Sequence, residues 1–212
     1  YPAMDKDYGD PATVDLALKE WDEVLKQLPR IDAIMVPGGD PGHTHPKNLM
    51  PMLEKQAAQL EKHHKGVKWY VAPQGFNVDW MNEFYAIRKT QPKWLTGVVH
   101  GPQVRDSLAK LRASIPPQYT IRNYPDITHS FSAQYAVPQW DLAYPQTEAR
   151  EVINPRPTDE RKIFDATNKY TFGFLTYSEG VNDDVNKFVW SSLGWDSKVD
   201  LRSALRDYSR YF

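Results

Sequence analysis

Six short apolar runs in this chain each end in a polar side chain that could take part in chemistry. Each of these side chains lies in or beside a turn that contains proline or glycine. They are Asp5, Asp40, Gln74, His100, Asp126 and Glu179. Carboxylates and imidazoles can hold or release a proton near neutral pH when burial or a neighbouring charge shifts their pKa. The pattern therefore predicts acid–base chemistry wherever the fold gathers these residues.

The first candidate is Asp40, which follows two glycines in the segment 36–45. Glycines let the backbone turn tightly and present a carboxylate. We interpret Asp40 as a catalytic carboxylate, and His43 and His45 as side chains that bind a hydroxyl or carboxylate of the substrate. The alternative is an ordinary Asp-Pro-Gly turn. The segment lacks the Lys-Ser/Thr of a phosphate-binding loop, so a nucleotide site is not indicated.

The second candidate is Glu179, at the end of the last apolar run. We expect it to be the partner carboxylate, with Tyr177 and Asp183 contacting the substrate. The oxygen-bearing side chains nearby would also suit calcium, although no EF-hand-like loop is present. They are Asn182, Asp183, Asp184 and Asn186.

The remaining candidates are expected to bind substrate, and they are Gln74, His100, Asp126, His129 and Trp140. Trp140 belongs to a long segment, 127–157, that is rich in aromatic, arginine and acidic residues. Loops of this length inside a compact domain are uncommon and usually functional. We expect a lid or a subsite wall, with a dimer contact or a simple cover as the alternative.

The elements that position these residues alternate along the chain. Apolar stripes with helical spacing predict helices over 14–28, 49–60, 80–87 and 104–111, and others beginning at 158, near 183 and after 197. The first is preceded by Asp10 and Pro11, which are typical of an N-cap and a first helical position. Apolar runs between them predict strands at 31–36, 67–72, 94–99, 119–124 and 170–177, with a stub at 1–4. Such alternation is typical of parallel strands joined by helices.

Two α/β architectures fit this alternation, a doubly wound sheet and a (β/α)8 TIM barrel. Polar residues at every strand end favour the barrel, because all its strand ends point into one ring. We expect a single domain over 1–212 with about six βα units, and the first two strands upstream. The partner that completes it would be a missing N-terminal part of the barrel or another copy of the chain. No targeting segment is visible after Tyr1.

Composition excludes several classes of protein. The 212 residues hold 26 Lys and Arg against 27 Asp and Glu, a net charge of -1, which argues against a nucleic-acid partner. With 41% hydrophobic residues, a membrane partner is not expected either. The absence of cysteine excludes disulfides and thiol chemistry. The 7 Trp, 12 Tyr and 8 Phe suit a site that stacks flat rings such as sugars.

The run Ile34-Met35-Val36-Pro37-Gly38-Gly39-Asp40 resembles the end of strand four in family 20 β-hexosaminidase barrels. The whole chain is also similar to bacterial barrel proteins grouped with the glycoside hydrolases. The resemblance implies a hydrolase that cleaves a glycosidic bond, with Asp40 orienting the substrate. It breaks at Pro41, where the family has its acidic Glu. We therefore expect Glu179 to be the general acid. The reaction needs no cofactor or metal, and a carbohydrate substrate suggests a periplasmic or secreted protein.

Two other readings stay open. One is a metal-dependent hydrolase that uses His43, His45, His100 and His129. The other is a carbohydrate-binding barrel without catalysis, which the proline at position 41 makes credible.

Overall fold

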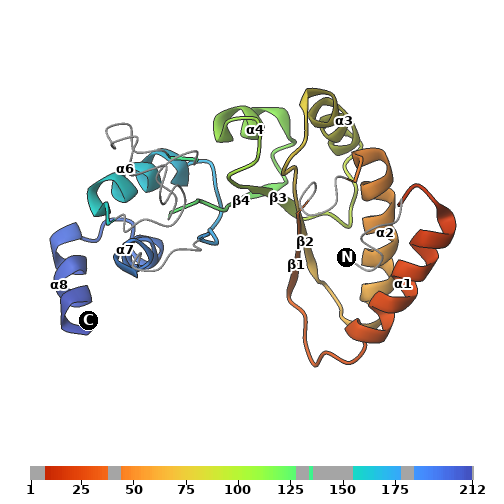
Figure 1. Ribbon diagram of the computed structural model, residues 1–212, viewed down its shortest axis with the longest axis horizontal. Helices are drawn as coiled ribbons and strands as arrows, with labels where there is room; N and C mark the ends of the chain where they lie inside the picture. Colours follow the sequence, from red (N-terminus) through yellow and green to blue (C-terminus); the bar gives the residue numbers. More distant parts are fainter. Residues whose placement is uncertain (1–7, 38–43, 128–133, 136–154, 178–183, 212) are drawn as a thin grey trace, which may run out of the picture. The chain divides into compact units, whose positions relative to one another are not determined.

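The computed structural model describes residues 8–37, 44–127, 134–135, 155–177 and 184–211 (Figure 1). The chain divides into two compact units, Tyr1–Thr120 and Ile121–Phe212, which we treat separately. The described residues contain four strands and seven α-helices, an α/β composition as the sequence predicts. None of these helices combines the length and the apolar character needed to cross a lipid bilayer. The expectation of a single domain over 1–212 stays a prediction.

The first unit follows the expected alternation. Its elements are α1 (Pro11–Leu25), β1 (Ala33–Pro37), α2 (Pro46–His63), β2 (Lys68–Ala72), α3 (Val78–Lys89), β3 (Gly97–His100) and α4 (Leu108–Ser114). A fourth strand, β4 (Thr120–Asn123), starts at its last residue. The four parallel strands lie in the order β1-β2-β3-β4. The prediction of parallel strands joined by helices is confirmed.

The strand register places equivalent ends side by side. Ala33 pairs with Lys68 and Pro37 with Ala72, so the carboxyl ends of β1 and β2 are level. Figure 1 shows α1 and α2 on the same side of these two strands. Gly97 is required where β3 meets the start of β4, because a Cβ there would lie 2.3 Å from the Thr120 carbonyl oxygen.

The helix starts follow local rules. Asp10 caps α1, with its carboxylate accepting from the Thr13 amide at 3.1 Å and Pro11 in the first turn, as the sequence predicts. Helix α2 begins at Pro46, three residues before its predicted start, with His45 as the N-cap. The later helix predicted to begin at 158 begins one residue earlier. That helix, α6, starts at Pro157 and its N-cap is Arg156.

The second unit packs three helices on an extension of β4. They are α6 (Pro157–Asn168), α7 (Asp184–Trp195) and α8 (Leu201–Tyr211). The predicted strand at 170–177 forms isolated parallel bridges, Asn123 with Phe174 and Asp126 with Tyr177. The buried core of this unit consists of Ile127, Phe164, Val189, Trp190 and Leu193.

Candidate functional site

Five predicted site residues lie in the described part of the chain. His45, Gln74 and His100 belong to the first unit, and Asp126 and Tyr177 belong to the second. The other six lie outside the described residues, and they are Asp40, His43, His129, Trp140, Glu179 and Asp183. The predicted pairing of Asp40 with Glu179 therefore stays a prediction.

Gln74 follows β2, His100 ends the neighbouring strand β3, and the loops after these two strands meet. The backbone of Gln74 forms an antiparallel bridge with Val104, and the Gly75 amide donates to the Gln103 carbonyl at 3.0 Å. His100 closes β3 and is 6% exposed. The fold thus joins the loops after β2 and β3, as expected if both contribute to one site.

The chemical state of His100 follows from its surroundings. Burial lowers the pKa of its imidazole, although the Asp106 carbonyl opposes that shift. Nε2 lies 3.1 Å from this carbonyl, which only accepts, so in the neutral ring Nε2 carries the proton. Nδ1 then keeps its lone pair, and it is buried with no hydrogen-bond partner in the described part of the chain. His100 is therefore suited to accept a hydrogen bond.

Asp106 in the same loop is a polar centre that the sequence analysis missed. Its carboxylate accepts from the Tyr85 hydroxyl at 2.7 Å and pairs with Lys110 at 2.7 Å. Burial opposes ionisation of Asp106, but hydrogen bonds from Lys110 and Tyr85 outweigh it and lower the pKa of the carboxyl. This arrangement fixes the loop after β3, whose Asp106 carbonyl contacts His100.

His45 has a structural role in this fold. Its Nδ1 lies 3.3 Å from the Lys47 amide, which it caps, and 3.1 Å from a Glu83 carboxylate oxygen. Its ring contacts Trp80 at a centroid distance of 4.8 Å. Because Nδ1 cannot accept from the amide while donating to Glu83, only one of these hydrogen bonds forms at a time. The sequence signal for the cap was Pro46, a residue favoured in the first helical turn.

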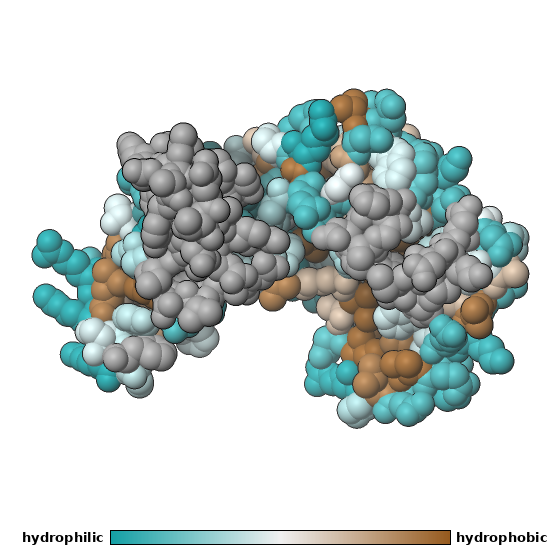
Figure 2. Space-filling model, viewed as in Figure 1, coloured by the Kyte–Doolittle hydropathy of each residue, from teal (hydrophilic) through white to brown (hydrophobic). Residues whose placement is uncertain are grey.

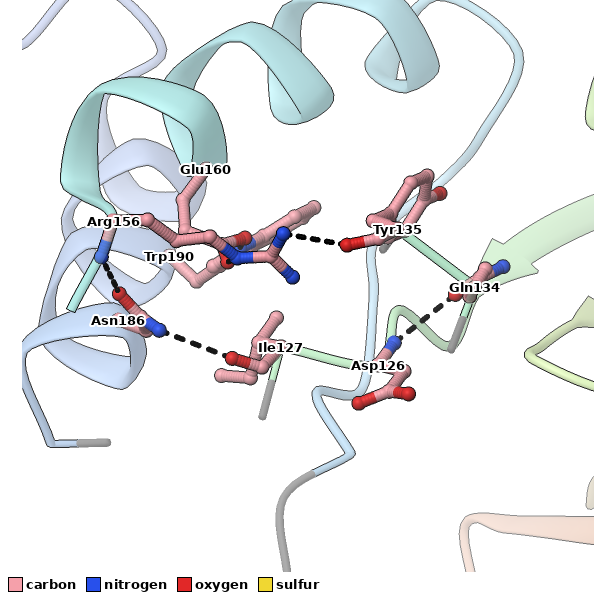
Figure 3. Close-up of polar contacts among 8 residues, drawn as sticks. All are labelled: Asp126, Ile127, Gln134, Tyr135, Arg156, Glu160, Asn186 and Trp190. Carbon is pink, nitrogen blue, oxygen red and sulfur yellow. Dashed lines mark hydrogen bonds and ion pairs between the residues drawn. The ribbon is translucent and has the colours of Figure 1, made fainter. Parts of the chain in front are cut away.

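In the second unit, Asp126 and Tyr177 lie side by side at the ends of paired segments. Asp126 is 1% exposed, and the Tyr177 amide donates to the Pro125 carbonyl at 2.8 Å. The Asp126 amide donates to the Gln134 side-chain oxygen at 3.0 Å (Figure 3). In that view the Asp126 carboxylate points away from Gln134. These predicted residues from distant parts of the sequence are brought together.

A second buried carboxyl, Glu160 on α6, lies in the same unit. One of its oxygens accepts from Arg156 Nε at 3.0 Å, and the other accepts from Trp190 Nε1 at 2.6 Å. Burial raises the pKa of Glu160 to about 7, and Asp126 adds to the rise, while Trp190 and Arg156 act against it. This carboxyl can therefore change its protonation state near neutral pH.

Arg156 connects Glu160 to the strand end that carries Asp126. Its guanidinium donates to the Tyr135 carbonyl at 2.5 Å, and its amide donates to Asn186 Oδ1 at 3.0 Å. The Asn186 side chain in turn donates to the Ile127 carbonyl at 3.0 Å. Figure 3 shows these contacts as one continuous set. Asn186, considered above as a calcium ligand, thus has both ends of its amide engaged within the protein.

The sequence analysis did not identify Glu160, Asn186 or Trp190 as parts of a buried polar network. In the sequence, Glu160 is one of two acidic residues in the first turn of α6, where acids are common. The available signal was the spacing of Arg156 and Glu160, four positions apart across the start of a predicted helix, where opposite charges can pair.

The described residues include no group of three or more His, Cys, Asp or Glu side chains placed to hold a metal ion. No protein-family model matches this chain, and no curated protein sequence does either.

Proposed function

We propose that this chain is the greater part of a (β/α)8 barrel that cleaves a glycosidic bond in a carbohydrate by carboxylate acid–base chemistry. One observation carries the proposal. Asp126 is a buried acidic residue at a strand end, and it is paired directly with Tyr177 in the neighbouring segment. Glu179 follows Tyr177 by two positions in the sequence.

The strand order supports the barrel. The four strands follow one another in chain order, and the segment 174–177 comes next to the continuation of β4. A doubly wound sheet reverses direction at a switch point, so its strand order is not sequential. A singly wound order is what a barrel requires.

Apolar side chains are exposed near β1, the first strand of this order, and in the segment 172–175 at its other end. Their exposure favours a complete barrel with further strands. In Figure 2, brown apolar atoms gather on the first unit near β1 and α1. They border a hollow of about 150 Å³ whose lining includes Leu25, Ile34 and Met35. In the second unit, Phe172 is 62% exposed and Leu175 is 52% exposed. We propose that additional strands cover these side chains, supplied either by an N-terminal part of the same barrel or by another copy of the chain.

The chemistry follows from what glycoside hydrolysis needs. One carboxyl must donate a proton to the leaving oxygen, and a second must stabilise or attack the sugar carbon. We assign the acid to Glu179 and the second role to Asp40, with Asp126 and Tyr177 contacting the sugar. The burial of Asp126 fits a role in a site from which water is excluded, where charged groups interact more strongly.

The test is hydrolysis of a panel of aryl glycosides by the wild type and single variants. We expect Glu179→Gln to lower kcat at least 100-fold, the usual loss for a general acid. Asp40→Asn and Asp126→Asn should each lower kcat/KM tenfold or more. Asp15→Asn, an exposed change on α1, is the matched control and should leave the rate unaltered. Equal rates for Glu179→Gln and the control would overturn the assignment.

A second candidate is a carbohydrate-binding barrel that does not catalyse. Pro41 favours it, because it stands where the resembling family has its acid. If the wild type hydrolyses no glycoside in the panel but binds one of the parent sugars, this second function replaces the first.

A further inference from the structure

An elongated groove runs along α2 in the first unit, away from the carboxyl ends of the strands. It consists of two adjoining hollows of about 520 Å³ and about 480 Å³, which share Glu54 and Trp94 in their linings. One continues towards Glu61, and the other continues towards Lys47. These two residues are 14 positions apart on the helix, which gives a length of about 21 Å at ~1.5 Å per residue.

Trp94 lies where the two hollows meet, and contacts with neighbouring residues fix its position. It packs against Trp69, which is 4% exposed, with ring centroids 6.1 Å apart and the rings nearly perpendicular. The turn that carries it is closed by a bond from the Leu95 amide to the Pro92 carbonyl at 3.3 Å. The same carbonyl accepts from the Tyr119 hydroxyl at 3.1 Å. A half-buried aromatic ring is therefore fixed in the groove before any ligand arrives.

Charged groups without partners surround this ring. Within the described chain, Glu54, Lys47 and Lys93 form no ion pair, and all three are exposed. The lining also holds two paired carboxylates, Glu61 with Lys65 at 4.0 Å and Glu83 with His45 at 3.1 Å. The groove thus offers carboxylate acceptors and ammonium donors on both sides of a central ring.

We propose that this groove binds an extended, neutral oligosaccharide, as a second carbohydrate site separate from the one at the strand ends. An aromatic ring flanked by carboxylates and amines matches a sugar, whose ring faces are apolar and whose edge carries hydroxyls that both donate and accept. The length of the groove suits several sugar rings in a row.

Other polymers fit the groove less well. A chain of phosphates needs an excess of positive charge, but the lining sets Lys47 and Lys93 against Glu54, Glu61 and Glu83, and the nearby Lys65 is paired with Glu61 at 4.0 Å. A peptide that adds as a strand needs an open sheet edge, but β2 is paired on both sides, with β1 and β3. A neutral sugar polymer needs neither an excess of positive charge nor an open sheet edge, so it fits the groove best. The choice of carbohydrate as ligand rests on the proposed function, but binding at the groove does not require catalysis.

The test is the retardation of the protein in native gels that contain soluble polysaccharides: β-glucan, xylan, glycol chitin or starch. We expect at least one to retard the wild type, and Trp94→Ala to weaken that affinity about tenfold. Glu54→Gln should weaken it a fewfold and serves as the second variant if Trp94→Ala does not fold. Trp195→Ala, which removes a tryptophan that is 93% exposed in the other unit, is the matched control and should bind as the wild type does.

Three results would overturn the proposal. The first is that no polysaccharide in the set retards the wild type. This includes the case in which a peptide, selected for binding to the protein, binds the wild type instead and binds Trp94→Ala more weakly. The second is that Trp94→Ala and Glu54→Gln bind as tightly as Trp195→Ala. The third is loss of all retardation in Asp126→Asn, which would assign the binding to the strand-end site. Retardation that survives in Asp126→Asn while hydrolysis falls supports two separate sites.

Discussion

Each unit buries a charged residue completely, and the two units accommodate that charge in different ways. In the first unit, Arg88 on α3 has no exposed surface, and none of its three nitrogens has a hydrogen-bond partner among the residues that the structure describes. Its guanidinium lies 3.7 Å from the centre of the Tyr119 ring. In the second unit, Glu160 is equally buried but has donors on both oxygens.

The two residues show two ways in which a protein can compensate a buried charge for its lost hydration. An aromatic face attracts a cation but does not replace the hydrogen bonds that a guanidinium makes in water. Burial accordingly lowers the pKa of Arg88 to about 10, with Tyr119 acting in the opposite direction. The hydrogen bonds from Arg156 and Trp190 stabilise the Glu160 anion. The free energy of unfolding of this unit therefore depends on the side chains that supply them. Removing a partner should therefore harm the second unit more than removing the charge harms the first.

The largest effect is expected from Arg156→Met. This change leaves Glu160 buried beside Trp190 without its cation, and breaking a buried ion pair typically costs about 3–5 kcal/mol. Urea denaturation at pH 8 measures the loss in the free energy of unfolding. Arg202→Met, an exposed change on α8, is the control and should alter it by less than about 0.5 kcal/mol. A small effect of Arg156→Met would mean that Glu160 does not depend on this cation.

A smaller effect is expected from pH. Because the folded pKa of Glu160 is about 7, above its ordinary value, the folded state holds a proton that the unfolded state has already lost. Its contribution is fully present below the unfolded pKa and is lost as pH rises through about 7. The shift corresponds to about 3 kcal/mol.

The comparison that isolates this group is wild type against Glu160→Gln, unfolded in urea from pH 4 to pH 8. We expect the wild type to lose stability relative to the variant across this range. Parallel curves for the two proteins would contradict the assignment.

The smallest effect, and one of opposite sign, is expected from Arg88→Met. Replacing a buried charge that lacks hydrogen bonds with an apolar side chain of similar length is often neutral or stabilising, here by about 1 kcal/mol. Thermal unfolding of the variant measures it. Marked destabilisation would show that the contact with Tyr119 outweighs the loss of hydration, and the contrast between the two units would then disappear.

The sequence was sufficient for the alternation of helices and strands. Asp10 and Pro11 predicted the start of α1, and the apolar run at 67–72 predicted β2, because caps and periodicity act locally. The isolated bridges at Phe174 and Tyr177 were less predictable, since the pairing of that segment depends on its neighbours. Among the site residues, Asp126 and Tyr177 were named for their places at strand ends, but their contact was not visible in the sequence.

The groove on α2 and the network around Glu160 were not predictable for the same reason. Trp94 looked like one strand residue among several, and Glu160 looked like one acid in a helical turn. What distinguishes them is the neighbours they acquire, Trp69 for the first and Arg156 with Trp190 for the second.

The amino-acid order by itself determined the alternation of helices and strands in the first unit, and that acidic and amide groups follow its apolar runs. These outcomes depend on interactions between residues a few positions apart. Only the tertiary structure decided which ionisable groups lose their water and which partners compensate them. Desolvation depends on contacts between residues that are distant in the sequence, and no local pattern encodes those contacts.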